Sequence, residues 1–397
     1  MFDSIPVAPP DPILGLNEAF RNDPHPDKIS LGAGMYRDET GHTPIFAAVK
    51  EAERRLLDAE DTKTYLPING SPEYAAAVQE LLLGPDAEVV ASRRAATVQA
   101  PGGTGALRVA ADLLHKFHPD ATVWVSDPTW SNHFGVFGGA GFEVKAYPYY
   151  DAERKSVAFG AMLDAIGGIP QGDVLLLHAC CHNPTGMDLT PEQWDQVAAA
   201  AVQRDVLPFL DFAYQGFGNG LDEDAASVRR ICAACPEALI TNSFSKNFGL
   251  YNERVGALTA VCSSTAAAEA TLSQLKIAIR WNYSNPPSHG ATIATTVLTD
   301  PALRARWEQE LAAVRGRIHD MRRLLVDGLQ ARGLDFGFLV DQTGMFSYSG
   351  LSKDQVAALR ERYSVYLVGS GRINVAGVNR GNVDRLCDAV ADVVKGS

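Results

Sequence analysis

Five short apolar runs constrain the fold of this 397-residue chain more than any other feature of its sequence. They cover residues 121–128, 172–181, 205–214, 237–245 and 254–262. Apolar residues follow one another there without polar alternation, which is typical of strands buried on both faces. Helical stretches such as "TPEQWDQVAAAAVQRD" lie between several of the runs. This order predicts an α/β fold with a mostly parallel sheet covered by helices.

The pattern changes after Pro301, where a long amphipathic helical stretch leads into shorter strand-like segments and a last helix, "NVDRLCDAVADVVKG". We therefore expect three parts. Residues 1–44 form an N-terminal arm and part of a small domain, residues 45–314 form a large domain, and residues 315–397 form the rest of a small α+β domain.

Composition and the chain's start narrow the class of protein. A formal net charge of -12 argues against a nucleic-acid partner, which favours a basic face. The first residues lack the basic and apolar regions of a signal peptide, and no apolar run is long enough to span a bilayer. We expect a cytoplasmic protein with no membrane partner.

Six cysteines in so long a chain do not indicate a disulfide scaffold. Cys232 and Cys235 form a CxxC without a second ligand pair, so we expect them to pack a helix rather than to hold zinc. The adjacent Cys180 and Cys181 are expected to be buried thiols beside a site, poorly placed to share one metal ion. The sequence predicts no metal.

Chemically useful residues follow several of the apolar runs. Trp130 follows the first run, Asn183 the second, and Lys246 the fourth, while Asp211 and Tyr214 end the third. Each has an ordinary structural explanation, such as a cap or a core position. Because ligands of open α/β sheets bind at the carboxyl ends of strands, their shared position favours a functional site.

The segment "PGGTGALR" places glycines where a helix begins. Glycines allow close approach, and free N–H groups at a helix start face an anion. This predicts a phosphate site with Gly103, Thr104 and Gly105 as donors. The turn lacks the lysine of a nucleoside-triphosphate loop and the spacing of a dinucleotide fingerprint.

Lys246 lies in "TNSFSKNFGLYNERVG", with Ser243 and Ser245 before it and Arg254 after it. A lysine without carboxylate neighbours in sequence can become neutral and nucleophilic. Together with a phosphate site and a strand-end acid, Asp211, this predicts pyridoxal phosphate, which needs a Schiff-base lysine and an acid at its pyridinium nitrogen. Arg254 would pair with the phosphate.

The segments "SFSKNFGLYNERVG", "PGGTGALR", "HNPTG", "DFAYQGFG" and "RINVAG" together resemble the aspartate and aromatic amino-acid aminotransferases of the fold-type I pyridoxal phosphate class. The likeness runs from about residue 11 to the end of the chain. It implies a large domain with a mostly parallel seven-stranded sheet and a small domain made from both chain ends. It also implies a homodimer with two shared active sites.

The resemblance also implies roles for individual residues. Lys246 matches the Schiff-base lysine and proton shuttle, and Asp211 the pyridinium partner. Tyr214 and Asn183 match the groups at the phenolic oxygen of the cofactor, and Trp130 the residue stacked on its ring. The phosphate-site matches are Gly103, Thr104, Ser243, Arg254 and, from the partner subunit, Tyr65.

Further matches lie around these residues. His133 and His178 match histidines behind the acid partner of the ring, and Pro128 and Pro184 match cis prolines. The substrate-binding matches are Gly34, Trp130, Asn183, Phe346, Arg372 for the α-carboxylate and Arg280, contributed across the dimer, for the distal carboxylate.

The implied activity is transfer of the amino group of aspartate, and of aromatic amino acids, to 2-oxoglutarate by a ping-pong mechanism. Thr43, Thr104 and Asn285 resemble the aspartate branch, whereas "TYLPING" and "VSDPTW" resemble the aromatic branch. A primarily aromatic aminotransferase is therefore the alternative. Other pyridoxal phosphate chemistry would not require both Arg280 and Arg372, and a non-catalytic protein would be expected to lose the lysine or its acid partner.

Overall fold

A computed structural model describes residues 2–8 and 14–396, so residues 9–13 of the expected N-terminal arm lie outside the described part. Contacts divide the chain into two compact units. The larger unit is Pro44–Gly316, and the smaller unit joins the described residues up to Thr43 with those from Arg317 onward. Each unit is described by itself.

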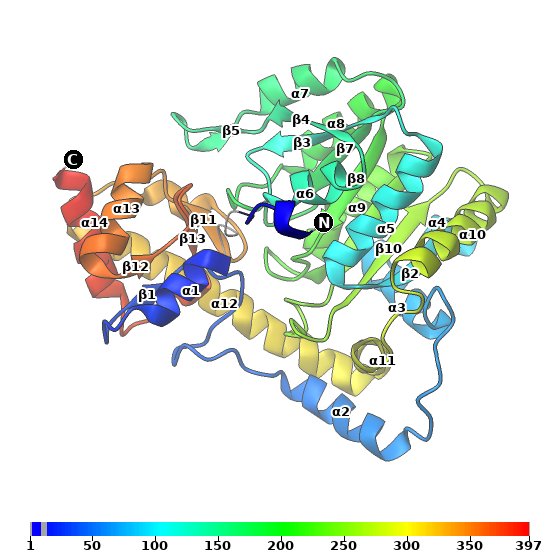
Figure 1. The fold of residues 1–397 in the computed structure, drawn as a ribbon, viewed down its shortest axis with the longest axis horizontal. Coiled ribbons are helices and arrows are strands. Elements are labelled where there is room, and N and C mark those ends of the chain that lie inside the picture. Colours follow the sequence, from blue (N-terminus) through cyan, green and yellow to red (C-terminus); the bar gives the residue numbers. More distant parts are fainter. Residues whose placement is uncertain (1, 9–13, 397) are drawn as a thin grey trace. The chain divides into compact units, whose positions relative to one another are not determined.

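The larger unit is built on a seven-stranded sheet in the order β2-β10-β9-β8-β7-β3-β4 (Figure 1). The strands are β2 (Ala95–Pro101), β3 (Thr122–Asp127), β4 (Glu143–Pro148), β7 (Val174–His178), β8 (Leu207–Phe212), β9 (Ala238–Ser243) and β10 (Val255–Val261). Strand β10 is antiparallel to both of its neighbours, β2 and β9, and every other pair in this sheet is parallel. The predicted mostly parallel sheet is therefore confirmed, with β2 and β4 as two strands beyond the five apolar runs.

Two rows of helices cover this sheet. Helix α5 (Gly102–Phe117) packs on β2, β9 and β10, with α6 (Asn132–Gly138) and α10 (Thr265–Asn282) beside it. The second row consists of α7 (Phe159–Gly167), α8 (Pro191–Arg204), α9 (Leu221–Ala234) and α3 (Pro72–Leu83). The remaining elements are α2 (Ala47–Ala59), α4 (Glu88–Ala91), α11 (His289–Thr299), the short hairpin of β5 (Tyr150–Asp151) and β6 (Ser156–Val157), and α12 (Pro301–Ala331), which continues into the smaller unit.

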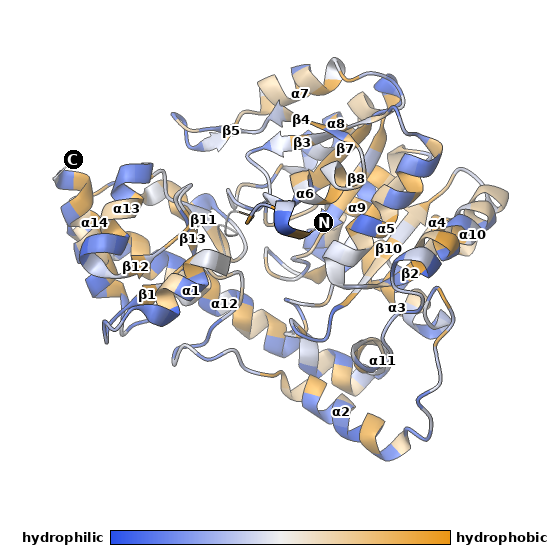
Figure 2. Ribbon diagram, in the orientation of Figure 1, coloured by the Kyte–Doolittle hydropathy of each residue, from blue (hydrophilic) through white to orange (hydrophobic). Residues whose placement is uncertain are grey.

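Burial explains why the strand sequences lack alternation. Every residue of β7, β9 and β10 is buried. Leu176, Leu239 and Leu258 belong to one core cluster with Leu107 and Leu114 of α5. Figure 2 shows hydrophobic residues along interior strands such as β7 and β8. Both faces of these strands therefore need apolar side chains.

Local signals fix several helix ends. Ser71 caps α3 by accepting a hydrogen bond from the Tyr74 amide, and the helix ends before Gly84. Thr190 and Gln193 form a reciprocal capping box at the start of α8. Helix α5 begins at Gly102, so the glycine turn is itself the first turn of the helix.

The smaller unit contains two small sheets and a helical layer. Its elements are η1 (Phe2–Ser4), α1 (Leu14–Asn22), β1 (Ile29–Ser30), η2 (Gly337–Asp341), β11 (Phe346–Tyr348), α13 (Lys353–Tyr363), β12 (Val365–Tyr366), β13 (Arg372–Asn374), η3 (Val375–Gly377) and α14 (Val383–Lys395). Strand β1 pairs in parallel with β12, and β11 pairs antiparallel with β13. Through β1, the N-terminal segment completes a sheet with the C-terminal part of the chain.

In the part of the chain that the structure describes, no helix combines the length and the apolar character needed to cross a bilayer.

Candidate active site

The carboxyl ends of the parallel strands meet at one edge of the sheet in the larger unit. Asp211 of β8 lies opposite His178 of β7 and Thr241 of β9. At the end of β9, Ser243 lies opposite Gly256 of the antiparallel strand β10. The predicted site residues that follow β2, β3, β7, β8 and β9, and Arg254 just before β10, are therefore brought to the same edge.

A chain of hydrogen bonds leads away from the Asp211 carboxylate. Its Oδ2 lies 3.0 Å from His133 Nε2, and His133 is fully buried. His133 Nδ1 lies 2.7 Å from Thr129 Oγ1, which lies 3.1 Å from His178 Nε2. The Trp130 ring meets the His133 ring edge-on at 5.3 Å. Residues from α6, β7 and the loop between β3 and α6 thus fix the direction in which Asp211 points.

These contacts keep Asp211 ionised. Burial by itself raises the pKa of Asp211, but His133, His178 and Lys246 outweigh burial, so the pKa lies below its ordinary value. Burial, followed by the neighbouring His133, lowers the pKa of His178 to about 3. A carboxylate whose pKa is lowered at this edge suits a ligand that presents a protonated ring nitrogen.

Lys246 is held in a different environment. Its Nζ lies 4.7 Å from the centre of the Tyr214 ring. Desolvation lowers the pKa of Lys246 to about 8; Asp211 opposes this shift and Arg254 adds to it. A lysine with this pKa supplies a neutral amine at ordinary pH far more often than an exposed lysine does.

Beside the lysine, backbone and side chains form a turn with the donors that an anion needs, and we call it the anion-binding turn. Helix α5 has no side chain capping its first amides. A Cβ added at Gly102 would lie 2.4 Å from Arg254 Nη2, and one added at Gly103 would lie 3.3 Å from the Ser243 Cβ. Arg254 also lies 3.4 Å from Ser245 Oγ. Glycine is therefore required for helix amides, a guanidinium and hydroxyls to surround the same position.

Other sequence-predicted features have clear positions. The Asp127–Pro128 and Asn183–Pro184 peptide bonds are both cis, as expected, and Asn183 is buried. Thr104 lies in the first turn of α5.

Three predicted substrate-binding residues lie together in the smaller unit. The Arg372 guanidinium lies 4.2 Å from the centre of the Phe346 ring, and its Nη2 donates a 2.8 Å hydrogen bond to the Gly32 carbonyl. A Cβ at Gly34 would lie 3.6 Å from Phe346 Cζ. Asn374 Nδ2 donates to the carbonyl of Met35, which fixes the backbone beside Gly34.

Two predicted residues stay apart from this chain's own site. The Tyr65 side chain is 90% exposed on the connection between α2 and α3. Arg280 is exposed in the last turn of α10, where it donates to the Ser284 hydroxyl. The action of Tyr65 and Arg280 in a partner subunit stays a prediction.

Sequence reasoning missed residues that complete the histidine chain. Thr129 bridges two histidines, and its position between Pro128 and Trp130 was the available signal. His182 lies 2.9 Å from both Ser126 Oγ and Thr185 Oγ1, and burial lowers its pKa.

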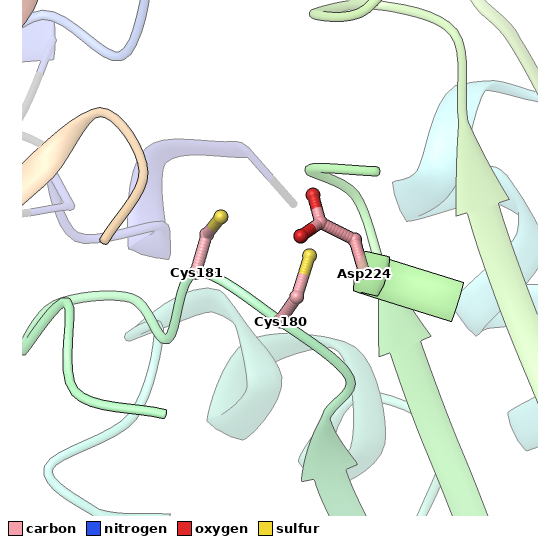
Figure 3. Close-up of side chains that lie close together, drawn as sticks. All are labelled: Cys180, Cys181 and Asp224. Atoms are coloured by element: carbon pink, nitrogen blue, oxygen red, sulfur yellow. The ribbon is translucent and has the colours of Figure 1, made fainter. Parts of the chain in front are cut away.

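The cysteine expectations need one correction. Cys232 and Cys235 are buried, and Cys235 contacts the Ala198 carbonyl, which confirms helix packing. Cys180 and Cys181 are buried thiols as predicted. Their neighbouring positions in the sequence do not, however, keep their Sγ atoms apart. Their Sγ atoms and a carboxylate oxygen of Asp224 all lie within 4.8 Å of one another, because Cys181 has a left-handed φ of 51° (Figure 3).

The edge of the larger unit fits pyridoxal phosphate on its own chemistry. Asp211 would hold the ring nitrogen, Lys246 the aldehyde carbon, and Tyr214 and Asn183 the phenolic oxygen. The anion-binding turn would hold the phosphate, because it combines uncapped helix amides with Arg254. This donor set agrees with the cofactor in charge and in kind.

Comparison with known proteins gives the same assignment. A family model described as "Aminotransferase class I and II" matches residues 26–390. An aspartate aminotransferase from Salmonella typhi is 53% identical over 396 residues, which cover 99% of this chain and 100% of that relative. An aromatic-amino-acid aminotransferase from Escherichia coli (strain K12) is 48% identical over 397 residues, covering 99% and 100%.

Among solved structures, an aromatic-amino-acid aminotransferase from Burkholderia pseudomallei, covalently bound to pyridoxal phosphate, matches with a TM-score of 0.97 and 51% identity over 99% of both chains. The resemblance noted in the sequence is confirmed over the whole length of the chain. The chain therefore belongs to the aminotransferase class I and II family, so it is an aminotransferase of a family whose cofactor is pyridoxal phosphate.

Proposed function

We propose that this aminotransferase moves the amino group of aspartate, and of aromatic amino acids, to 2-oxoglutarate. The observation that carries the proposal is the pairing of an ionised Asp211 with a Lys246 of lowered pKa at one sheet edge. The lowered pKa of Asp211 favours its charged form, and the lowered pKa of Lys246 favours its neutral form, as an acid partner and a base require. Relatives named for aspartate and for aromatic amino acids are of similar identity, which supports both substrate classes.

The residues of this chain have distinct tasks in the proposed reaction. Bound pyridoxal phosphate supplies an electron sink for the Cα–H bond of the amino acid. The neutral form of Lys246 Nζ, which the lowered pKa favours, would take the Cα proton and return it to C4′ of the cofactor. Asp211 keeps a proton on the ring nitrogen, and its hydrogen bond to His133 fixes the carboxylate in that direction. Tyr214 and Asn183 donate to the phenolic oxygen.

We also propose how substrates are bound. Arg372 holds the α-carboxylate through a bidentate pair, since the Phe346 ring and the Gly32 carbonyl already orient its guanidinium. Arg280 of a partner subunit holds the distal carboxylate of a dicarboxylic substrate. We propose that the two compact units are the large cofactor domain and the small domain of the family.

Substrate preference is tested by single-turnover half-reactions. The purified enzyme is mixed with aspartate, with phenylalanine or with alanine, and loss of the cofactor's visible band is followed against concentration. We expect aspartate to be the most efficient, phenylalanine to react measurably, and alanine to react poorly. An efficiency for phenylalanine equal to that for aspartate would favour the aromatic alternative, and equal efficiency with alanine would contradict the proposal.

A homodimer with shared sites is supported by Tyr65 and by Trp281, whose side chain is 74% exposed next to Arg280. Its test mixes two inactive variants, Lys246→Ala and Arg280→Ala, after partial denaturation and refolding. A site with Lys246 from one subunit and Arg280 from the other is complete in a hybrid dimer, so random pairing restores about a quarter of the wild-type activity on aspartate. No recovery would contradict shared sites.

A cytoplasmic location is supported by six cysteines that are all unpaired.

A further inference from the structure

The loop that leaves β8 after Asp211 and Tyr214 is closed by one carboxylate of the next helix. Asp224, in the first turn of α9, is 5% exposed. Its Oδ2 accepts hydrogen bonds from the amides of Gly216 at 2.8 Å and Gly218 at 2.9 Å. Its Oδ1 accepts from the amide of Asn219 at 2.8 Å. We call these three bonds the Asp224 clasp.

The backbone of the loop is shaped to receive this carboxylate. Gly216 has a φ of 91°, which a side chain would strain. A Cβ at Gly218 would lie 2.5 Å from Asp224 Oδ1. Gln215 Nε2 donates to the carbonyls of Leu81 at 3.0 Å and Leu221 at 3.1 Å, so the loop is also tied to α3 and α9. The clasped residues therefore have little freedom to shift.

The clasp connects directly to Tyr214. The Phe217 amide, between two clasped residues, donates to the Tyr214 carbonyl at 3.0 Å. The same carbonyl lies 4.0 Å from Cys181 Sγ. The ring of Tyr214 is the surface over which Lys246 Nζ lies at 4.7 Å. A shift of the clasped loop would therefore move Tyr214 relative to Lys246.

Asp224 also lies beside the two thiols, which raises the question of a metal site (Figure 3). Burial raises the pKa of the Cys180 thiol, and Cys181, Asp224 and Asp188 raise it further. Metal ligation requires thiolates, so these surroundings oppose it. The carboxylate oxygens that a metal would need already accept three backbone N–H groups. The contacts favour a structural clasp over a metal site.

We propose that Asp224 is a positioning residue for transamination: its clasp on the loop Gly216–Asn219 fixes the place of the Tyr214 hydroxyl against the cofactor. This inference rests on the proposed function of Tyr214 and adds Asp224 as the residue that fixes the position of the Tyr214 side chain. Misplacement of a catalytic group by about 1 Å can cost up to roughly 100-fold in rate, so the clasp has a measurable task.

The first test compares Asp224→Asn with Asp222→Asn in the enzyme loaded with pyridoxal phosphate. Asp222 lies in the same turn of α9, but its side chain is 82% exposed and pairs with Arg229, so this control removes the same charge outside the clasp. We expect faster hydrogen exchange of the Gly216, Gly218 and Asn219 amides only in Asp224→Asn. The pH midpoint of the visible band should shift, and kcat/KM should fall by about tenfold.

A second variant guards against misfolding of Asp224→Asn. Gly218→Ala keeps the carboxylate but places a methyl group against its Oδ1, so it should loosen the same amides. Unchanged amide exchange in both variants would overturn the clasp. Binding of added Zn²⁺ or Cd²⁺ to the loaded enzyme, lost in both Asp224→Asn and Cys180→Ser, would overturn it in favour of a metal site.

A double-mutant cycle with Tyr214→Phe separates this proposal from the function on which it rests. If Asp224 acts through the Tyr214 hydroxyl, Asp224→Asn should add little to the band shift or to the loss of kcat in the Tyr214→Phe background. Fully additive effects would overturn the positioning role. A Tyr214→Phe variant that is itself silent in both readouts would instead refute the proposed function of Tyr214.

Discussion

The lowered pKa of Lys246 makes a quantitative prediction about stability in enzyme freed of its cofactor. The pKa of this lysine is about 8 in the fold, against an ordinary value of 10.5. Between these values the unfolded chain binds more protons than the folded chain, so the free energy of unfolding rises with pH. Each pH unit across this window contributes ~1.4 kcal/mol. The gain is therefore about 3 kcal/mol, or somewhat less because the side chain is partly exposed.

The assay compares cofactor-free wild type with Lys246→Met, which keeps an apolar stem of similar length and cannot titrate. Urea unfolding is measured at equal protein concentration between pH 7 and pH 10.5. Other titrating groups are shared by both proteins and cancel in the difference. We expect wild type to gain about 2–3 kcal/mol relative to the variant as the pH rises.

Two results would refute this reasoning. A difference that stays constant across the window would mean that the pKa of Lys246 is not lowered by the fold. A difference that moves in the opposite direction would mean that Asp211 holds the lysine charged. In Asp211→Asn the opposing charge is absent, so the rise should begin at lower pH than in wild type.

Three further predictions address the anion-binding turn, the distal carboxylate and the clasp. Gly103→Ala should weaken the binding of pyridoxal phosphate about tenfold in equilibrium titration, because the new Cβ would lie 3.3 Å from the Ser243 Cβ. The control is Gly316→Ala, whose new Cβ would have no neighbour within 4 Å. Arg280→Val should lower kcat/KM for aspartate by about 100-fold or more and change that for phenylalanine far less; equal losses would contradict a distal-carboxylate role. Because burial raises the pKa of Asp224 to about 6 from 3.8, wild type should lose stability relative to Asp224→Asn as the pH rises through that range, and a pH-independent difference would contradict this.

Much of the sheet could be predicted because burial on both faces leaves a plain signal in the sequence. The signal fails where a strand is polar or at an edge. Strand β2 carries the buried Thr97 and Gln99, and β4 exposes Glu143 and is flanked by one neighbour only. The residues of β10 do not indicate that this strand is antiparallel to its neighbours, because an apolar run carries no information about strand direction. The helix-free connection from β9 was the available hint, since parallel pairs need a longer crossover.

The site, too, has parts that the sequence could predict and parts that it could not. Strand-end position was enough to single out Lys246, Asp211 and Tyr214 from the sequence. The contacts that tune them join residues far apart in the chain, as between His133 and Asp211, which are 78 positions apart. Asp224 gave no signal either, because an acid in the first turn of a helix is common for reasons of helix dipole alone.

Asp211 and Lys246 each have a lowered pKa although their opposite charges lie at one edge of the sheet. A free carboxylate beside a buried lysine would keep the lysine charged and take away its nucleophilic character. Here the Asp211 Oδ2 already has a partner in His133, at 3.0 Å, and that histidine is held by Thr129 from its far side. Lys246 lies instead over the Tyr214 ring, with the cation of Arg254 disfavouring its proton. Desolvation of Lys246 thus outweighs the opposing charge of Asp211, so the lysine keeps a lowered pKa although both groups lie at the same edge of the sheet.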